Sequence, residues 1–295
     1  MTAPGDVRVA SSDFGYPGLS PEFLLDLLVE LGLDGVSIGL FPGRSNWPMD
    51  AIGAAPQAWA ERIARELSER GLGLSDVFHI PARKLTELTV NHPDAAQREE
   101  SERLFTIYAD FAAAVGSSGI TLPPGLVFGG ESWAAAADRA AEHLRRRIEI
   151  AGERGLRCSV EPHIVSLNPY AGSIVDTPAK ALALIERAPG LELTLDYGHY
   201  VVQGIPDREI EPLLEHARHF HVRGAAKGLV QTRLEDNVID YGRALDRLAA
   251  IGYDGWVEVE QIYDQRPGCS NCDNIQELRK WSAFVRERAA ARAAG

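Results

Sequence analysis

Short apolar runs alternate along the whole chain with longer segments whose apolar residues recur at helical spacing. Eight of the short runs predict strands: Val7–Ala10, Val36–Leu40, Leu74–Ile80, Gly119–Leu122, Arg157–Glu161, Leu191–Asp196, His219–Arg223 and Trp256–Glu260. A helix is predicted after each strand: Ser20–Leu31, Pro56–Arg70, Asp94–Val115, Ser132–Arg154, Thr177–Arg187, Asp207–Ala217, Asp240–Ile251 and Ile275–Ala291. Several of these helices begin at Ser, Thr or Asp and end at Gly, which are typical capping residues.

This alternation of eight strands and eight helices predicts a closed parallel (β/α)₈ TIM barrel. The alternative is an open doubly wound sheet, which usually carries a G-x-G-x-x-G turn after its first strand. The segment Ser11–Gly18 does not contain that motif. Because no linker or low-complexity block interrupts the pattern, we expect one TIM-barrel domain over residues 1–295.

Polar residues share one face of the last four predicted strands. In the seventh strand Phe220 and Val222 suit the helix-facing side, so His219, His221 and Arg223 are predicted to point into the barrel. The same alternation turns further residues inward: Ser159 and Glu161 of the fifth strand, Asp196 of the sixth, and Glu258 and Glu260 of the eighth. Four consecutive strands therefore end by directing a carboxylate or an imidazole at one point.

This convergence predicts a metal site. Burying several carboxylates costs several kcal/mol each unless a cation or hydrogen bonds compensate. A divalent cation compensates by favouring ionised Glu161, Asp196 and Glu260, with neutral His221 as the fourth ligand. Three oxygens and one nitrogen suit Mn²⁺, the first expectation, or Mg²⁺ or Co²⁺. These residues fall at the C-terminal strand ends, where TIM-barrel active sites lie.

The segment from Ser159 to Gln261 resembles the xylose-isomerase-like sugar isomerase and epimerase superfamily, the group with D-tagatose 3-epimerase, hydroxypyruvate isomerase and inosose dehydratase. The matching pieces are Val160–His163, Leu195–His199, Phe220–Val222, Asn237–Tyr241 and Gly252–Val257, followed by Val259–Glu260. Their order and spacing both fit, and they cover little over a third of the chain.

The resemblance implies the metal ligands Glu161, Asp196, His221 and Glu260. It also implies that Glu161 and Glu260 flank the substrate carbon and exchange its proton, and that His199 binds a substrate oxygen.

Three further residues are candidates for substrate contact. His163 shares the parity of Glu161, which places it at the rim. In the related epimerases an arginine follows the strand-seven histidine by a few residues. Here Lys227 stands in that place, with Arg223 nearer.

Two metal-dependent activities follow from removing a proton next to a carbonyl. We expect an isomerase or epimerase of a ketose or related keto-polyol, acting through an enediolate. If a β-hydroxyl or alkoxy group departs instead, the same site is a lyase, such as an inosose-type dehydratase or an enzyme that eliminates an aglycone from a keto-sugar. The endonuclease branch of the superfamily and a non-catalytic subunit are less favoured alternatives.

The net charge of −12 disfavours a nucleic-acid partner, because duplex binding requires a basic face. No stretch reaches the apolar length of a membrane span, and Met1–Asp6 lacks the features of a leader. We therefore expect a cytoplasmic protein that acts on a small molecule, as a homo-oligomer or with a partner subunit if it assembles.

Other residues have two interpretations each. His79 could reach the pocket or be a capped loop histidine, and Gln231 and Arg233 could close over substrate or be solvated. Trp47 and Phe41 could pack on a sugar ring or form a subunit contact. The alanine-rich stretch Trp133–Ala141 predicts close helix packing or an oligomer interface. Among the cysteines, Cys158 is expected in the core, and Cys269 and Cys272 as reduced loop residues.

Overall fold

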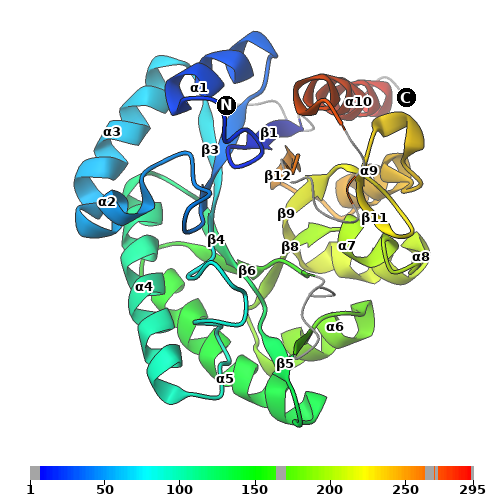
Figure 1. Ribbon diagram of the computed structural model, residues 1–295. Helices are drawn as coiled ribbons and strands as arrows, with labels where there is room; N and C mark the ends of the chain where they lie inside the picture. Colours follow the sequence, from blue (N-terminus) through cyan, green and yellow to red (C-terminus); the bar gives the residue numbers. More distant parts are fainter. Residues whose placement is uncertain (1–6, 164–170, 263–268, 270–271, 294–295) are drawn as a thin grey trace.

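The computed structural model describes residues 7–163, 171–262, 269 and 272–293. Within them eight parallel strands close into a barrel in the order β1-β12-β9-β8-β6-β4-β3-β2, which confirms the predicted (β/α)₈ fold (Figure 1). The barrel strands are β1 (Arg8–Ser12), β2 (Gly35–Leu40), β3 (Gly73–His79), β4 (Gly119–Leu122), β6 (Arg157–Val160), β8 (Glu192–Asp196), β9 (Ala217–Val222) and β12 (Trp256–Val259). Each lies within two residues of its predicted run at either end.

Helices surround the barrel, as Figure 1 shows. The long ones are α1 (Pro21–Glu30), α3 (Pro56–Glu69), α4 (Ala95–Ala114), α5 (Trp133–Gly152), α6 (Pro178–Arg187), α9 (Tyr241–Ala250) and α10 (Asn274–Ala293). Five of them begin as predicted, because a side chain accepts a hydrogen bond from a backbone amide of the first turn. These caps are Ser20, Asp94, Ser132, Thr177 and Asp240.

One predicted helix is wrong. Residues 207–217 form a single short helix, α8 (Asp207–Ile210), followed by a 3₁₀ helix, η1 (Glu211–His216), and Ala217 already belongs to β9. Pro212 lacks the amide hydrogen that would continue the α-helical ladder, so the segment tightens into 3₁₀ turns.

Additional short strands and helices lie at the C-terminal ends of the barrel strands. Two antiparallel pairs form there, β5 (Leu126–Phe128) with β7 (Ala171–Ser173) and β10 (Gly224–Ala226) with β11 (Leu229–Thr232). Three short helices, α2 (Met49–Ala54), α7 (Gly198–Val201) and η2 (Leu234–Asp236), complete the set. None of these pieces was predicted, because each is too short to show a period in the sequence.

The alternation of inward and outward side chains along β9 is interrupted at one position. Leu193 of β8 pairs with Ala217, whereas the next residue pairs with His219, so Arg218 is an extra residue in the strand. Both Arg218 and His219 consequently contact residues inside the barrel. Arg218 donates to Asp76 Oδ1 at 2.6 Å and to Ser159 Oγ at 3.0 Å, which builds a polar layer near the N-terminal end of the lumen.

The apolar core lies mainly between the strands and the helices. Phe220 and Val222 are fully buried there, as their predicted orientation requires. The alanines of α5 are also buried within the chain, which confirms close helix packing: Ala136, Ala137, Ala140 and Ala141. Cys158 is buried, as predicted. No helix in the described ranges combines the length and apolarity that a membrane crossing needs.

Candidate active site at the C-terminal rim

The four predicted metal ligands come together at the carboxyl ends of four adjacent strands. Glu161 follows β6, Asp196 ends β8, His221 lies in β9 and Glu260 follows β12. One ligand atom from each lies within 4.8 Å of the others, and all four residues are buried. The sequence-based parity is therefore correct at every one of these positions.

The orientation of the donor atoms fits a bound cation. His221 Nδ1 lies 2.9 Å from Glu161 Oε1 and 3.6 Å from Glu260 Oε2. Both carboxylate oxygens of Glu161, together with Asp196 Oδ2, His221 Nδ1 and Glu260 Oε2, are buried without a hydrogen bond of acceptable geometry. Buried polar atoms are normally satisfied, so convergent atoms of this kind mark a place for a ligand. Three carboxylates and an imidazole suit a hard or borderline divalent cation.

Three more predicted residues surround this cluster. His163 Nδ1 lies 2.8 Å from Glu161 Oε2, and its ring is 4.6 Å from the ring of His199. His199, in α7, places Nε2 3.6 Å from Asp196 Oδ2. Arg223 extends its guanidinium between Asp196 and Glu260. The structure thus brings together seven of the eight residues that the sequence singled out.

The ionisation of the cluster is strongly coupled. Burial alone would raise the pKa of Glu161, but His163 and His221 hold it well below its ordinary value. Burial would lower the pKa of His221, yet Glu260, Glu258 and Glu161 raise it well above the usual range. The pKa of Asp196 is raised to about 6, because burial and the charges of Glu260 and Glu161 outweigh Arg223. Without a cation, the imidazole therefore carries the proton that balances its carboxylate neighbours.

A deeper layer supports the rim. Glu258 accepts a hydrogen bond from Ser37 at 2.7 Å and lies 2.7 Å from His219 Nε2, so both of its oxygens are engaged. Its Oε1 is 3.8 Å from His221 Nε2, on the ring edge opposite Nδ1. A carboxylate behind a ligating histidine fixes the orientation of the ring. His219, His221 and Glu258 also lie close enough to hold an ion, but the hydrogen bonds of Glu258 favour this supporting role.

The eighth predicted residue lies apart. Lys227 occupies the turn between β10 and β11, where its side chain is exposed, and its aliphatic part passes Gly204. Arg233 is also exposed and pairs with Asp236. Gln231 is buried and holds the backbone of Ile262 through two hydrogen bonds, so it fastens the β10–β11 hairpin to the chain after β12.

The aromatic residues after β2 are internal. Trp47 and Phe41 are both buried within the chain, so the interpretation of either as a subunit contact is wrong. Phe41 packs with Phe14 and Phe78, and the ring of Phe78 is 5.9 Å from that of His163. This aromatic cluster therefore supports the histidine side of the candidate site.

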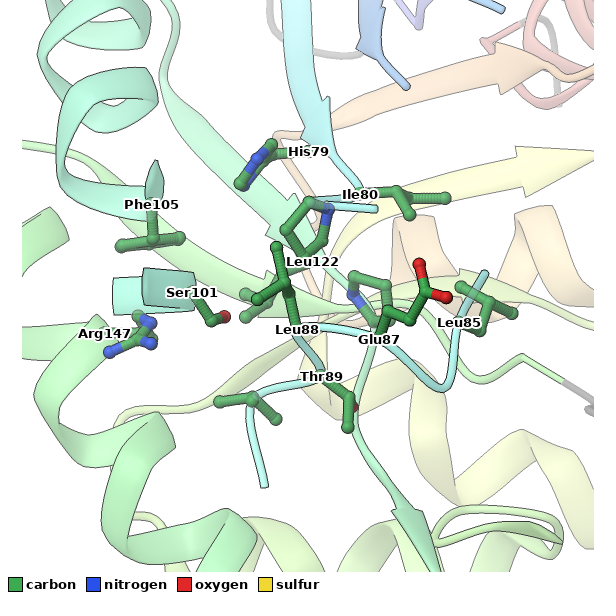
Figure 2. A pocket seen from close by; sticks show the side chains of 13 residues that line it. His79, Ile80, Leu85, Glu87, Leu88, Thr89, Ser101, Phe105, Leu122 and Arg147 are labelled. Atoms are coloured by element: carbon green, nitrogen blue, oxygen red, sulfur yellow. The ribbon is translucent and has the colours of Figure 1, made fainter. Parts of the chain in front are cut away.

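His79 lies in a different place from the cluster. It has the opposite parity to Asp76 and Phe78 and faces the helix layer, where its ring packs against the tilted ring of Tyr108 with 4.6 Å between the centroids. With Arg147, Ser101 and Phe105 it lines a small cavity between the β3 and β4 ends and the helices α4 and α5 (Figure 2). The cavity has about 20 Å³ of room for water-sized molecules, enough for a water but not for a sugar.

One rim residue, Asp13, which follows β1, was not predicted. Its Oδ1 accepts a hydrogen bond from the amide of Gly39 at 2.8 Å, while Oδ2 is buried without a partner. Burial raises its pKa to about 8, despite that hydrogen bond, so the carboxyl is a proton donor near neutral pH. The sequence predicted a first strand that ends at Ala10, whereas β1 continues to Ser12, so Asp13 was assigned to a loop rather than to a strand end.

Comparison with known proteins identifies the class. Residues 25–286 match the model of the xylose isomerase-like TIM barrel family, and the chain belongs to that family. No curated protein resembles the chain in sequence.

Solved structures with the same fold include sugar epimerases. The 3-keto-D-glucoside 4-epimerase of E. coli is 16% identical, with a TM-score of 0.71 over 96% of this chain and 100% of that one. The D-psicose 3-epimerase of Clostridium cellulolyticum H10, crystallised with D-tagatose, is 15% identical, with a TM-score of 0.74 over 96% and 99%. A xylose isomerase-like TIM barrel protein from Mycobacterium smegmatis in complex with magnesium is 16% identical, with a TM-score of 0.73 over 99% of both chains. At these identities the likeness extends to the fold alone.

Proposed function

We propose that the protein is a divalent-metal-dependent isomerase or epimerase of a ketose or related keto-polyol. The observation that carries this proposal is the buried cluster of Glu161, Asp196, His221 and Glu260, whose ligand atoms converge at the C-terminal rim. A purely structural role is a poor explanation, because His221 and Arg223 supply at most two positive charges to three buried carboxylates that converge on one point. Membership of the xylose isomerase-like family and the sugar epimerases among the structural neighbours support the substrate class.

Glu161, Asp196, His221 and Glu260 would hold the metal, for which we propose Mn²⁺, Mg²⁺ or Co²⁺. Bound there, the cation supplies electrostatic stabilisation of the negative charge that develops when a proton leaves the carbon next to a carbonyl. Proton transfer and substrate binding would be carried out by side chains.

Two carboxylates would exchange the proton. Glu161 and Glu260 follow strands β6 and β12, which have β8 and β9 between them, so the two side chains approach the site from different directions. In the proposed reaction one carboxylate removes the proton from the substrate carbon and the other returns a proton on the opposite face. His163, at 2.8 Å from Glu161 Oε2, orients that carboxylate and can relay its proton.

Substrate oxygens would be bound by the surrounding cationic and imidazole groups. His199 Nε2 and Arg223 Nη2 lie 3.2 Å from each other at the edge of the cluster. Both present nitrogen atoms to the same region, which suits a hydroxyl or carbonyl oxygen of a sugar. Lys227, given its position in the exposed turn, would contribute only if the β10–β11 hairpin moved toward the site.

The test is solvent-deuterium uptake, followed by mass spectrometry, into a panel of ketoses, inososes and 3-keto-glycosides with and without Mn²⁺. Metal-dependent uptake without mass loss is the expected result and would establish enolising isomerase chemistry. Uptake together with loss of water or an aglycone would identify the same site as that of a lyase. Absence of exchange across the panel with metal bound would contradict the proposal.

A further inference from the structure

Arg223 places a full positive charge inside the anionic cluster. Its side chain is 1% exposed, and Nη1 lies 2.7 Å from Glu260 Oε2. Its Nη2 makes an even shorter contact with Asp196 Oδ2 and lies 3.2 Å from His199 Nε2. One guanidinium therefore bridges two of the four residues that would ligate the metal.

The oxygens that Arg223 holds are the ones that a metal needs. Asp196 Oδ1 already accepts a hydrogen bond from the amide of Gly198 at 2.7 Å, which leaves Oδ2 for a cation. In Glu260 it is Oε2 that faces His221 Nδ1, at 3.6 Å, and the same atom contacts Arg223. A cation bound between these oxygens would meet the guanidinium at close range in a buried site, where like charges repel strongly.

Arg223 is also held firmly in place. Its backbone amide and carbonyl both hydrogen-bond to the hydroxyl of Tyr241, at 3.3 and 3.0 Å. Tyr241 is itself fully buried against Trp281, so the base of the Arg223 side chain is anchored. A change of partner therefore has to come from movement of the guanidinium, which can leave one carboxylate and contact another group.

We propose that Arg223 is a resident cation that pairs with both Asp196 and Glu260 in the metal-free protein and competes with the divalent metal for their oxygens. The inference rests on the proposed metal site. Three carboxylates carry three negative charges, so a divalent cation alone leaves one uncompensated and Arg223 supplies the balance. In the metal-free state the arginine keeps the buried carboxylates paired, and in the metal-bound state it keeps the whole site neutral at the cost of weaker metal binding.

Substitution of Arg223 separates these two effects. Arg223→Met removes the charge while keeping an unbranched side chain close in size to the aliphatic part of arginine. Arg223→Lys keeps the charge but lacks the planar guanidinium that contacts two carboxylates at once. In EDTA we expect Arg223→Met to unfold at a temperature at least about 5 °C below the wild type. Its dissociation constant for Mn²⁺ should fall at least about ten-fold, which corresponds to about 1.4 kcal/mol of removed repulsion. Arg223→Lys should lie between the two.

The experiment is isothermal titration of metal-stripped protein with Mn²⁺ alone, paired with thermal unfolding in EDTA and in Mn²⁺. Arg218→Met is the matched control, because Arg218 is an equally buried lumen arginine that pairs with Asp76 in the deeper layer. It should lower the unfolding temperature while leaving the dissociation constant for Mn²⁺ within about two-fold. Tightening in the control as large as that in Arg223→Met would show general loosening of the barrel and would overturn the inference.

The remaining outcomes are distinct. An unchanged or weaker Mn²⁺ affinity in Arg223→Met, with clear binding to the wild type, leaves the metal site standing and overturns the role of Arg223. Lack of Mn²⁺ binding by both proteins overturns the proposed metal site itself. If Arg223→Met does not fold, Arg223→Lys decides alone, since tighter binding than in the wild type supports competition and equal or weaker binding excludes it.

Discussion

Glu161 and Glu260 have the same side chain but different surroundings. Glu161 is flanked by two imidazoles, with His163 Nδ1 at 2.8 Å and His221 Nδ1 at 2.9 Å. Glu260 instead contacts the guanidinium of Arg223 at 2.7 Å. The two carboxylates therefore differ in the groups that hold them: imidazoles at Glu161, and at Glu260 a guanidinium that remains charged throughout the usual pH range.

Glu260→Gln is expected to lower the rate of deuterium exchange by at least about a hundred-fold, because an amide neither ligates as an anion nor removes a proton. The fold should persist, since the amide keeps the size and hydrogen-bonding capacity of the side chain. Glu277→Gln is the matched control: Glu277 is equally buried but lies in α10, where it pairs with Lys280. Exchange retained in Glu260→Gln would remove Glu260 from the proposed chemistry.

His79 should make the stability of the fold sensitive to acid. Burial, assisted by the charge of Arg147, lowers its pKa from 6.5 to about 3, so the folded state keeps the ring neutral while the unfolded state takes up a proton. A group with a depressed folded pKa loses its stabilising contribution as the pH falls below the unfolded pKa. Tyr108, Arg147 and Glu87 are ionisable groups around it, and the carboxylate of Glu87 does not offset the effect of burial, since the pKa of His79 stays at about 3.

Between pH 7.5 and pH 5.0 the free energy of unfolding should therefore fall by about 2 kcal/mol more in the wild type than in His79→Gln. Urea denaturation of both proteins at the two pH values measures this difference. Parallel pH profiles would mean that the ring of His79 is solvated or paired in the folded protein.

At the level of the strands, the position at which each strand ends determines which side chains lie at the C-terminal rim. Glu161 and Glu260 stand one residue after β6 and β12, so the last strand residues set the direction of both side chains. The N-terminal end of the barrel is closed differently. The ring of Trp256 in β12 fills the space above two glycines, Gly35 of β2 and Gly73 of β3.

Gly35→Ala tests this packing. An added Cβ would lie 2.5 Å from the carbonyl oxygen of Gly73 and 2.8 Å from Trp256 Cη2, too close for either to remain in place. We expect the free energy of unfolding in urea to fall by about 1–3 kcal/mol. Gly152→Ala, at the end of α5 where nothing lies within 4 Å, should instead raise it by about 0.5–1 kcal/mol. Equal effects would mean that the Trp256 ring moves aside without loss.

At the scale of the whole molecule, closure of the barrel encloses a second charged pair. Arg218 of β9 and Asp76 of β3 meet in the lumen at 2.6 Å, and both are almost fully buried. The pair exists only because β9 and β3 come from distant parts of the chain and face each other across the closed barrel.

Removing one partner leaves the other charged and buried. Arg218→Met should therefore lower the free energy of unfolding by about 3–5 kcal/mol, and the double variant Arg218→Met with Asp76→Asn should recover part of that loss. Urea denaturation of the single and double variants gives the coupling free energy. Additive losses would show that the two charges do not depend on each other.

Much of the site could be predicted because it follows from local order along the chain. The alternation of apolar and polar residues defined the eight strands, and parity within each strand turned Glu161, Asp196, His221 and Glu260 inward. The inward position of Arg218 was not predicted, since it lies outside the predicted strand His219–Arg223 and an extra residue in a strand depends on the register with its neighbour rather than on the strand's own pattern. Parity also said nothing of Lys227, whose position depends on the path of a hairpin outside the barrel.

By itself the sequence determined the fold class, the order of the elements and which side chains face the lumen at the strand ends, because these depend on periods of two and about 3.6 residues. Only the tertiary structure decided the partners. The pairing of Arg223 with Asp196 and Glu260, of Glu258 with His219 and of His79 with Tyr108 joins separate strands and helices. Such contacts depend on barrel closure and strand register, which no local pattern encodes.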